Sequence, residues 1–189
     1  MTNKILSDFK KSIHHSLKAK EEKGYLCVSE QESKKSTIKN IYFGKGNTDD
    51  ILIIRQNIED CRPIENLFEG KTRIKSCDFI VFICKNRDLH IFFCEIKSSI
   101  SKENCEKALR QIRGSKIFLE YLCQNYKEYF DKDFEISLES AKNIYIYPAS
   151  NPQKKPTFAS KKNGLNFEKV KVDSNGNTIQ NDIYNFFRL

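Results

Sequence analysis

The segment 75–97 constrains the fold more than any other part of this chain, because it predicts a β-hairpin buried on both faces. Two apolar runs, 79–84 and 89–94, are rich in Ile, Phe and Val, and the polar stretch 85–88 separates them. Apolar runs of this composition joined by a short polar turn are typical of two antiparallel strands. Both faces of the paired strands are largely apolar, so we expect a central hairpin covered on both sides.

The register of this hairpin places three charged residues on one face. With Asn86 and Arg87 as turn residues, Asp78 lies opposite Glu95, with Cβ atoms about 5 Å apart, and Lys97 shares that face because it is two residues further on. Two carboxylates held together at the end of an apolar hairpin repel each other and lose hydration. A divalent cation would offset both costs, and Mg²⁺ suits such a place because it binds one or two carboxylates and keeps water and phosphate oxygens as further ligands.

This pattern, an acidic residue followed across a β-hairpin by Glu-x-Lys, resembles the PD-(D/E)XK nuclease superfamily, which includes many restriction endonucleases, Holliday-junction resolvases and RecB-like nucleases. Asp78 matches the first acidic residue and 95–97 matches the second half-motif, whereas Cys77 stands where proline often does. The resemblance covers residues 70–150. It implies an α/β fold with a restriction-endonuclease-like αβββαβ core, in which helices flank a central mixed sheet.

The resemblance also implies roles for individual residues. Asp78, Glu95 and the backbone carbonyl of Ile96 would bind Mg²⁺ or Mn²⁺, and Lys97 would orient or deprotonate the attacking water or stabilise charge in the transition state. Gln111 matches a glutamine that RecB-like members often carry on the next helix. A further acidic residue often completes such a site, and three glutamates of the N-terminal part are candidates: Glu30, Glu32 and Glu65.

Each of these residues also has a non-catalytic interpretation. The two carboxylates could face solvent at the strand ends and pair with Lys97 or Arg73. An exposed pair of that kind contributes only about 0–1 kcal/mol to stability. Gln111 and the three N-terminal glutamates could be ordinary surface residues.

The positive charge of the chain points to a polyanionic partner. The net charge is +8, and proteins that neutralise phosphates gain affinity by releasing condensed counterions. Seven residues are candidates for nucleic-acid binding: Arg110, Arg113, Lys116, Lys154, Lys155, Lys161 and Lys162. The abundance of lysine also fits an A/T-rich genome, and a solvated helix face explains the arginines equally well.

Length and composition predict one globular domain over residues 1–189. No apolar run approaches the ~20 residues of a membrane span, and the first residues lack the apolar core of a signal peptide, so we expect a cytoplasmic protein. The seven cysteines include no Cys-x-x-Cys pair, which favours reduced structural thiols over a zinc site. None of the three histidines has the spacing of a metal ligand, and the glycine-containing stretch 44–47 indicates a turn.

The periodicity of apolar residues predicts the other elements. We expect helices over 3–23, 102–129 and 181–187, and strands over 40–44, 51–55, 143–149 and 165–172. The segment 25–37 is ambiguous, and 58–74 should be a connection. A strand, a long helix and another strand suit a parallel crossover.

The function that the sequence favours is metal-dependent hydrolysis of nucleic-acid phosphodiester bonds, with DNA preferred over RNA. Phage defence, restriction or repair are the settings that the resemblance suggests, with the protein acting as a homodimer or beside a partner subunit. The first alternative is a catalytically inactive protein of the nuclease fold that binds nucleic acid or scaffolds a complex. The second is an interaction subunit with no nucleic-acid role.

Overall fold

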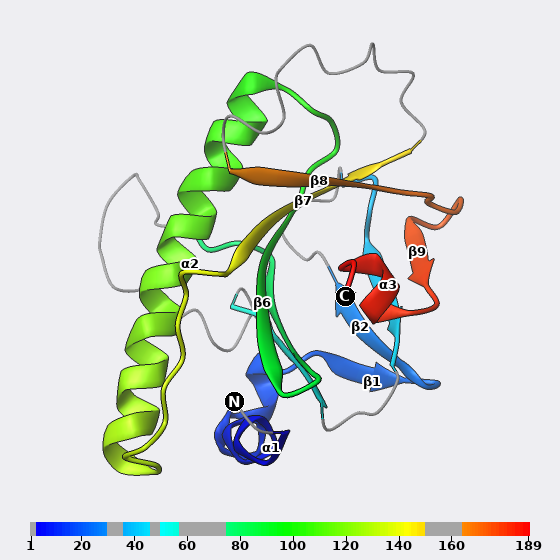
Figure 1. The fold of residues 1–189 in the computed structure, drawn as a ribbon. Helices are drawn as coiled ribbons and strands as arrows, with labels where there is room; N and C mark the ends of the chain where they lie inside the picture. The colour runs from blue at the N-terminus through cyan, green and yellow to red at the C-terminus, as the bar shows by residue number, and fades with distance from the viewer. Residues whose placement is uncertain (1–2, 30–35, 46–49, 57–74, 150–163) are drawn as a thin grey trace.

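A computed structural model describes residues 3–29, 36–45, 50–56, 75–149 and 164–189. The described elements follow one another along the chain as Figure 1 shows: α1 (Asn3–Ser12), the 3₁₀ helix η1 (His15–Leu17), β1 (Lys20–Glu22), β2 (Tyr25–Ser29), β3 (Asn40–Gly44), β4 (Ile51–Ile54), β5 (Phe79–Lys85), β6 (Asp88–Ile96), α2 (Lys102–Tyr129), β7 (Lys142–Pro148), β8 (Leu165–Val170), β9 (Asn177–Gln180) and α3 (Ile183–Phe186).

The described strands form two mixed sheets. The first has the order β4-β5-β6-β7-β8; β4, β5 and β6 are antiparallel neighbours, whereas β6, β7 and β8 run parallel. The second has the order β1-β2-β3-β9, with β3 and β9 parallel. The fold is therefore mixed α/β, as the sequence predicted.

The predicted hairpin register is confirmed. Lys85 pairs with Asp88, and the ladder continues back to Phe79 opposite Cys94. The turn residues Asn86 and Arg87 have φ of 54° and 71°, the left-handed conformation that a two-residue hairpin turn of type I′ requires at both central positions. Every residue of 79–84 is buried, so the hairpin is covered on both faces.

Two hydrophobic cores cover the two faces of the first sheet. On one face, Phe9 of α1 and Leu119 of α2 pack in the same cluster as Phe93 of β6. On the other face, Phe43 of β3 and a C-terminal segment that includes α3 pack with Phe92. Helices α1 and α2 thus cover one face of this sheet, whereas the second sheet and the short helix α3 cover the other (Figure 1).

Helix α2 has the predicted bounds. Ser101 caps its N-terminus by accepting a hydrogen bond from the backbone N–H of Asn104 at 3.1 Å, and Glu103 follows in the first turn, where a carboxylate is favourable. Ala108, Ile112, Ser115 and Leu119 are buried on its inner side, whereas Ile117 is 68% exposed. The helix connects β6 to the parallel strand β7, as expected for a crossover.

The prediction of a helix over 3–23 is correct for Asn3–Ser12 and wrong for the residues that follow. Helix α1 ends at Ser12, because the following backbone pairs with β4: Arg55 N–H donates to the Leu17 carbonyl at 2.7 Å. The apolar positions Phe9 and Leu17 are nevertheless buried, which explains why their spacing resembled a longer helix. Gly24, which follows the predicted range, has φ of 85° in the turn between β1 and β2.

The remaining parts of the chain compare with the sequence predictions as follows. Strand β2 resolves part of the ambiguous segment, and β9 was not predicted. The strands predicted at 40–44 and 51–55 are both present but lie in different sheets. The predicted connection 58–74 lies outside the described residues.

Among the helices described, none is both long enough and apolar enough to cross a membrane.

Candidate functional site

The candidate site lies at the open end of the β5–β6 hairpin, away from its turn. Asp78 immediately precedes β5, Glu95 is the second-last residue of β6, and Lys97 follows β6. Asp78 reaches across to the neighbouring strand, where its Oδ2 accepts a hydrogen bond from the backbone N–H of Ile96 at 2.6 Å. The fold therefore brings the residues of the predicted motif together.

Glu95 is a buried carboxylate, with an exposed fraction of 1%. One of its oxygens, Oε1, contacts the Lys97 ammonium, whereas Oε2 has no hydrogen-bond partner among the residues that the structure describes. Burial raises the pKa of Glu95 well above its ordinary value, and the charge of Asp78 raises it further; Lys97 and a hydrogen bond from the Asp78 backbone oppose both effects. The carboxylate is thus desolvated beside a second acidic group, with one oxygen available to another partner.

Lys97 and Gln111 lie side by side. The Lys97 ammonium donates to Gln111 Oε1 at 3.0 Å, in addition to its contact with Glu95, and its side chain is 19% exposed. The Gln111 amide nitrogen donates to the backbone carbonyl of Ser76 at 3.0 Å. Gln111 therefore connects α2 both to the lysine of the motif and to the segment that leads into Asp78.

A second polar connection, which the sequence did not reveal, lies one turn further along α2. The backbone N–H of Cys77 donates to Ser115 Oγ at 2.8 Å, and Ser115 Oγ donates to Gln56 Oε1 at 2.7 Å. The only sequence signal is that Ser115 lies four residues after Gln111, and hence on the same helix face, within an otherwise apolar stripe. No sequence pattern indicated Gln56, because it contacts a residue of α2 that is 59 positions away in the sequence.

The donor atoms at this site suit a small, hard cation. Glu95 Oε2 is buried without a partner, and Asp78 supplies a second carboxylate. The N–H of Ile96 points towards Asp78, and in a strand the C=O of a residue points to the same side as its N–H. No group of three or more His, Cys, Asp or Glu side chains gathers in the described ranges. Two carboxylates, a carbonyl and water form a set that Mg²⁺ accepts.

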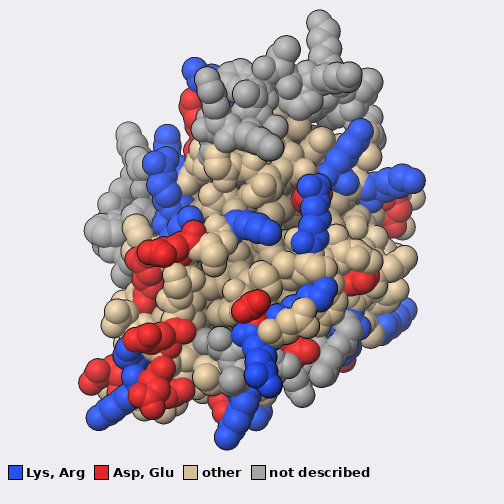
Figure 2. Space-filling view, viewed as in Figure 1, with Lys and Arg blue, Asp and Glu red and all other residues tan. Residues whose placement is uncertain are grey.

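The candidate nucleic-acid contacts are only partly described. Arg110 and Arg113 are exposed on α2, whereas Lys116 is half-buried with its ammonium 5.4 Å from the centre of the Phe93 ring. Figure 2 shows lysine and arginine side chains interspersed with acidic ones on the visible face. Eight other residues named from the sequence lie outside the described residues: Glu30, Glu32, Glu65, Arg73, Lys154, Lys155, Lys161 and Lys162.

The cysteines and histidines agree with a structural role where they are described. Six cysteines are free thiols, at positions 27, 77, 84, 94, 105 and 123, and Cys61 lies outside the described residues. His14 lies 2.8 Å from the Ser16 hydroxyl and stacks on His15. Burial lowers the pKa of His90.

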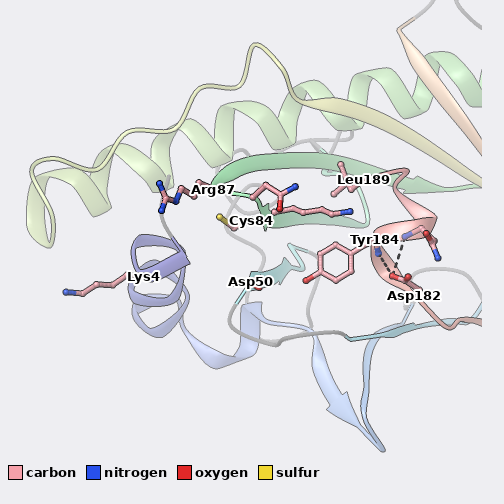
Figure 3. Close-up of a pocket in the computed structure, with 10 residues that line it drawn as sticks. Lys4, Asp50, Cys84, Arg87, Asp182, Tyr184 and Leu189 are labelled. Atoms are coloured by element: carbon pink, nitrogen blue, oxygen red, sulfur yellow. Dashed lines mark hydrogen bonds between the residues drawn. The ribbon is translucent and has the colours of Figure 1, made fainter.

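A cavity of about 720 Å³ lies at the opposite end of the hairpin, beside its turn (Figure 3). Its lining mixes Lys4, Lys85 and Arg87 with Asp50 and Asp182. None of the candidate site residues lines this cavity, so it is a separate feature of the molecule.

No family model, no curated protein and no solved structure matches this chain.

Proposed function

We propose that the protein is a metal-dependent nuclease related to the PD-(D/E)XK superfamily, and that Asp78, Glu95, Lys97 and Gln111 form its active site. The observation that carries the proposal is the buried Glu95 carboxylate, which has one oxygen without a partner and lies beside a second acidic residue. Burying an uncompensated carboxylate is costly, and such perturbed groups concentrate at functional sites.

The proposed roles follow from the contacts. Asp78 and Glu95 bind Mg²⁺ or Mn²⁺ together with the Ile96 carbonyl. The ion, when bound, polarises the phosphate and lowers the pKa of bound water. Gln111 holds the Lys97 ammonium beside Glu95, where it donates hydrogen bonds to the attacking water or to a phosphate oxygen as negative charge develops.

The order of elements supports the proposed relationship. Helix α1 precedes three antiparallel strands, β4, β5 and β6, and helix α2 then leads to β7, which is parallel to β6. Strands β1, β2 and β3, which belong to the second sheet, intervene between α1 and β4. Apart from this insertion, the order agrees with that expected of an αβββαβ core. The restriction-endonuclease-like classification rests on this agreement together with the motif.

A nucleic acid is the proposed substrate, because the chain carries a net charge of +8 and Arg110 and Arg113 are exposed on the helix that also carries Gln111. The resemblance to restriction endonucleases favours DNA. Positive groups on such a surface attract the phosphate backbone without reading its sequence. We propose that the four lysines between 154 and 162 contribute to the same attraction.

The direct test is cleavage by the purified chain with Mg²⁺ or Mn²⁺, using duplex DNA, single-stranded DNA and RNA. We expect cleavage that EDTA abolishes, and a loss of about 100-fold or more for Lys97→Ala, the usual effect of removing a group that stabilises developing charge. Lys107→Ala is the matched control, because Lys107 forms an exposed ion pair with Glu103 on the same helix. The proposal fails if no substrate is cut and Lys97→Ala binds nucleic acid like the wild type.

One observation favours a second candidate, a nuclease-fold protein that binds nucleic acid without cutting it. The Lys97 ammonium already contacts Glu95, so the site is partly neutralised from within. Thermal unfolding with and without Mn²⁺ separates the candidates. A chain that binds the ion should melt at a higher temperature with Mn²⁺, whereas an internally neutralised site should show no shift.

A further inference from the structure

A single peptide group just before Asp78 is held on both sides by α2. Its carbonyl belongs to Ser76 and accepts a hydrogen bond from Gln111 Nε2 at 3.0 Å. Its N–H belongs to Cys77 and donates to Ser115 Oγ at 2.8 Å. Because a peptide group is planar and rigid, these two contacts fix the orientation of the whole unit against the helix.

The peptide group and its partners on α2 are shielded from water. Ser76, Cys77 and Ser115 are all buried, within or beside an apolar core. Buried polar groups are stable only when they are paired, so each partner on α2 satisfies a group that water cannot reach. The two α2 residues are four positions apart and therefore lie on the same face of the helix.

Gln56 sets the direction of the Ser115 hydroxyl. Ser115 Oγ donates its proton to Gln56 Oε1 at 2.7 Å, which leaves its lone pairs for the Cys77 N–H. Gln56 follows β4 and has an exposed fraction of 1%. The contact thus extends from α2 through the serine to the strand that pairs with β5.

We propose that Ser115 is a positioning residue for the active site, and that Gln111 and Ser115 together form a clamp on the Ser76–Cys77 peptide. The clamp sets the start of β5, and with it the place of Asp78 relative to Glu95. Gln111 also holds Lys97, so one face of α2 positions the metal-binding carboxylate and the lysine together. This role of Ser115 rests on the proposed function, whereas the clamp itself does not.

The proposal accounts for Cys77 at a position where the superfamily often has proline. A proline has no N–H to donate, so the contact with Ser115 requires a different residue at position 77. In this chain, the hydrogen bond from the Cys77 N–H to Ser115 therefore restrains the backbone before Asp78.

The test compares Ser115→Ala with Thr178→Val in the full chain. Thr178 is a matched control, because its buried hydroxyl accepts from Gln180 Nε2 at 3.0 Å in the other sheet. The first readout is hydrogen exchange of the Cys77 amide, which we expect Ser115→Ala to accelerate by about tenfold or more as the local structure opens more often. The second is the Mn²⁺ concentration that gives half of the thermal stabilisation.

We expect Ser115→Ala to raise that Mn²⁺ midpoint by about 10- to 100-fold, the usual effect of losing a residue that orients a metal ligand. Thr178→Val should leave the midpoint unchanged even if it lowers the melting temperature. Gln56→Met removes the oxygen that accepts from Ser115 and keeps a side chain of similar size. It should shift the exchange rate of the Cys77 amide and the Mn²⁺ midpoint in the same direction as Ser115→Ala, but by a smaller amount. This second variant decides the matter if Ser115→Ala does not fold.

Two results would overturn the proposal: wild-type exchange of the Cys77 amide in Ser115→Ala, or a Mn²⁺ midpoint that moves no further than in Thr178→Val. A wild-type chain that shows no Mn²⁺ stabilisation contradicts the proposed function and the role of Ser115 in it. The exchange measurement still decides whether the clamp exists, so the two failures are distinguishable.

Discussion

Asp78 has two separable properties, a hydrogen-bond acceptor and a negative charge. Its Oδ2 accepts from the Ile96 N–H at 2.6 Å, and an asparagine keeps an oxygen at that place while removing the charge. We expect Asp78→Asn to change the free energy of unfolding by less than about 1 kcal/mol, whereas Asp78→Ala should cost about 1–3 kcal/mol by leaving the N–H without its acceptor. Both variants should lose the thermal stabilisation by Mn²⁺. Urea unfolding and melting curves measure the two effects, and full Mn²⁺ stabilisation of Asp78→Asn would contradict the proposed metal site.

Glu95 should reduce the stability of the metal-free chain at high pH. Because its pKa is raised in the folded state, its contribution to stability is fully present below the ordinary value of 4.5 and is lost as the pH rises through the folded pKa. Glu95→Gln has no such titration, and Lys97 keeps its hydrogen bond to Gln111. We therefore expect Glu95→Gln to gain stability relative to the wild type as the pH rises above 4.5, measured by urea unfolding in EDTA. If the difference in free energy of unfolding between Glu95→Gln and the wild type is the same at pH 4 and pH 9, this expectation is wrong.

The elements that the sequence predicted correctly are those determined by local pattern. The hairpin follows from two apolar runs and a two-residue turn, and the bounds of α2 follow from Ser101 and the apolar spacing. The helix expected over 3–23 failed because the backbone near Leu17 pairs with β4, a contact between distant segments. Strand β9 has no apolar run and depends on its parallel pairing with β3.

The same distinction applies to the candidate site. Asp78, Glu95, Lys97 and Gln111 were found from spacing, because one hairpin and the next helix bring them together. Ser115 and Gln56 are 59 positions apart and were not found. Their contact depends on how α2 packs against the first sheet, which no local pattern specifies.

The hairpin turn offers a test at the scale of an element. Arg87 has φ of 71°, a conformation that costs a residue with a side chain about 1 kcal/mol relative to glycine. We expect Arg87→Gly to raise the free energy of unfolding by about 0.5–1 kcal/mol without changing nuclease activity, because the turn lies at the far end of the hairpin. Lys85→Gly, within β5, is the contrasting variant and should lower stability. If Arg87→Gly destabilises the chain, contacts of the arginine side chain outweigh its backbone strain.

At the scale of the whole molecule, the two ends of the hairpin are chemically distinct. The open end carries the carboxylates of Asp78 and Glu95, and their side chains lie on the sheet face that α2 covers. The turn end borders the cavity between α1, the turn and α3 (Figure 3). Arg110 and Arg113 are exposed on α2, the helix that also carries Gln111, so we expect substrate bound at the open end to contact them.

The contribution of these arginines can be measured through the salt dependence of binding. Each phosphate that a side chain neutralises changes the slope of log K against log salt by about 0.9 for duplex DNA. We expect Arg110→Ala and Arg113→Ala each to weaken binding and to reduce the slope by up to that amount, measured by fluorescence anisotropy in EDTA so that no cleavage occurs. Lys107→Ala should leave the slope nearly unchanged, since Lys107 pairs with Glu103. If Arg110→Ala and Arg113→Ala have the same slope as the wild type, these two arginines do not contact the phosphate backbone, and other basic residues of the chain must bind it.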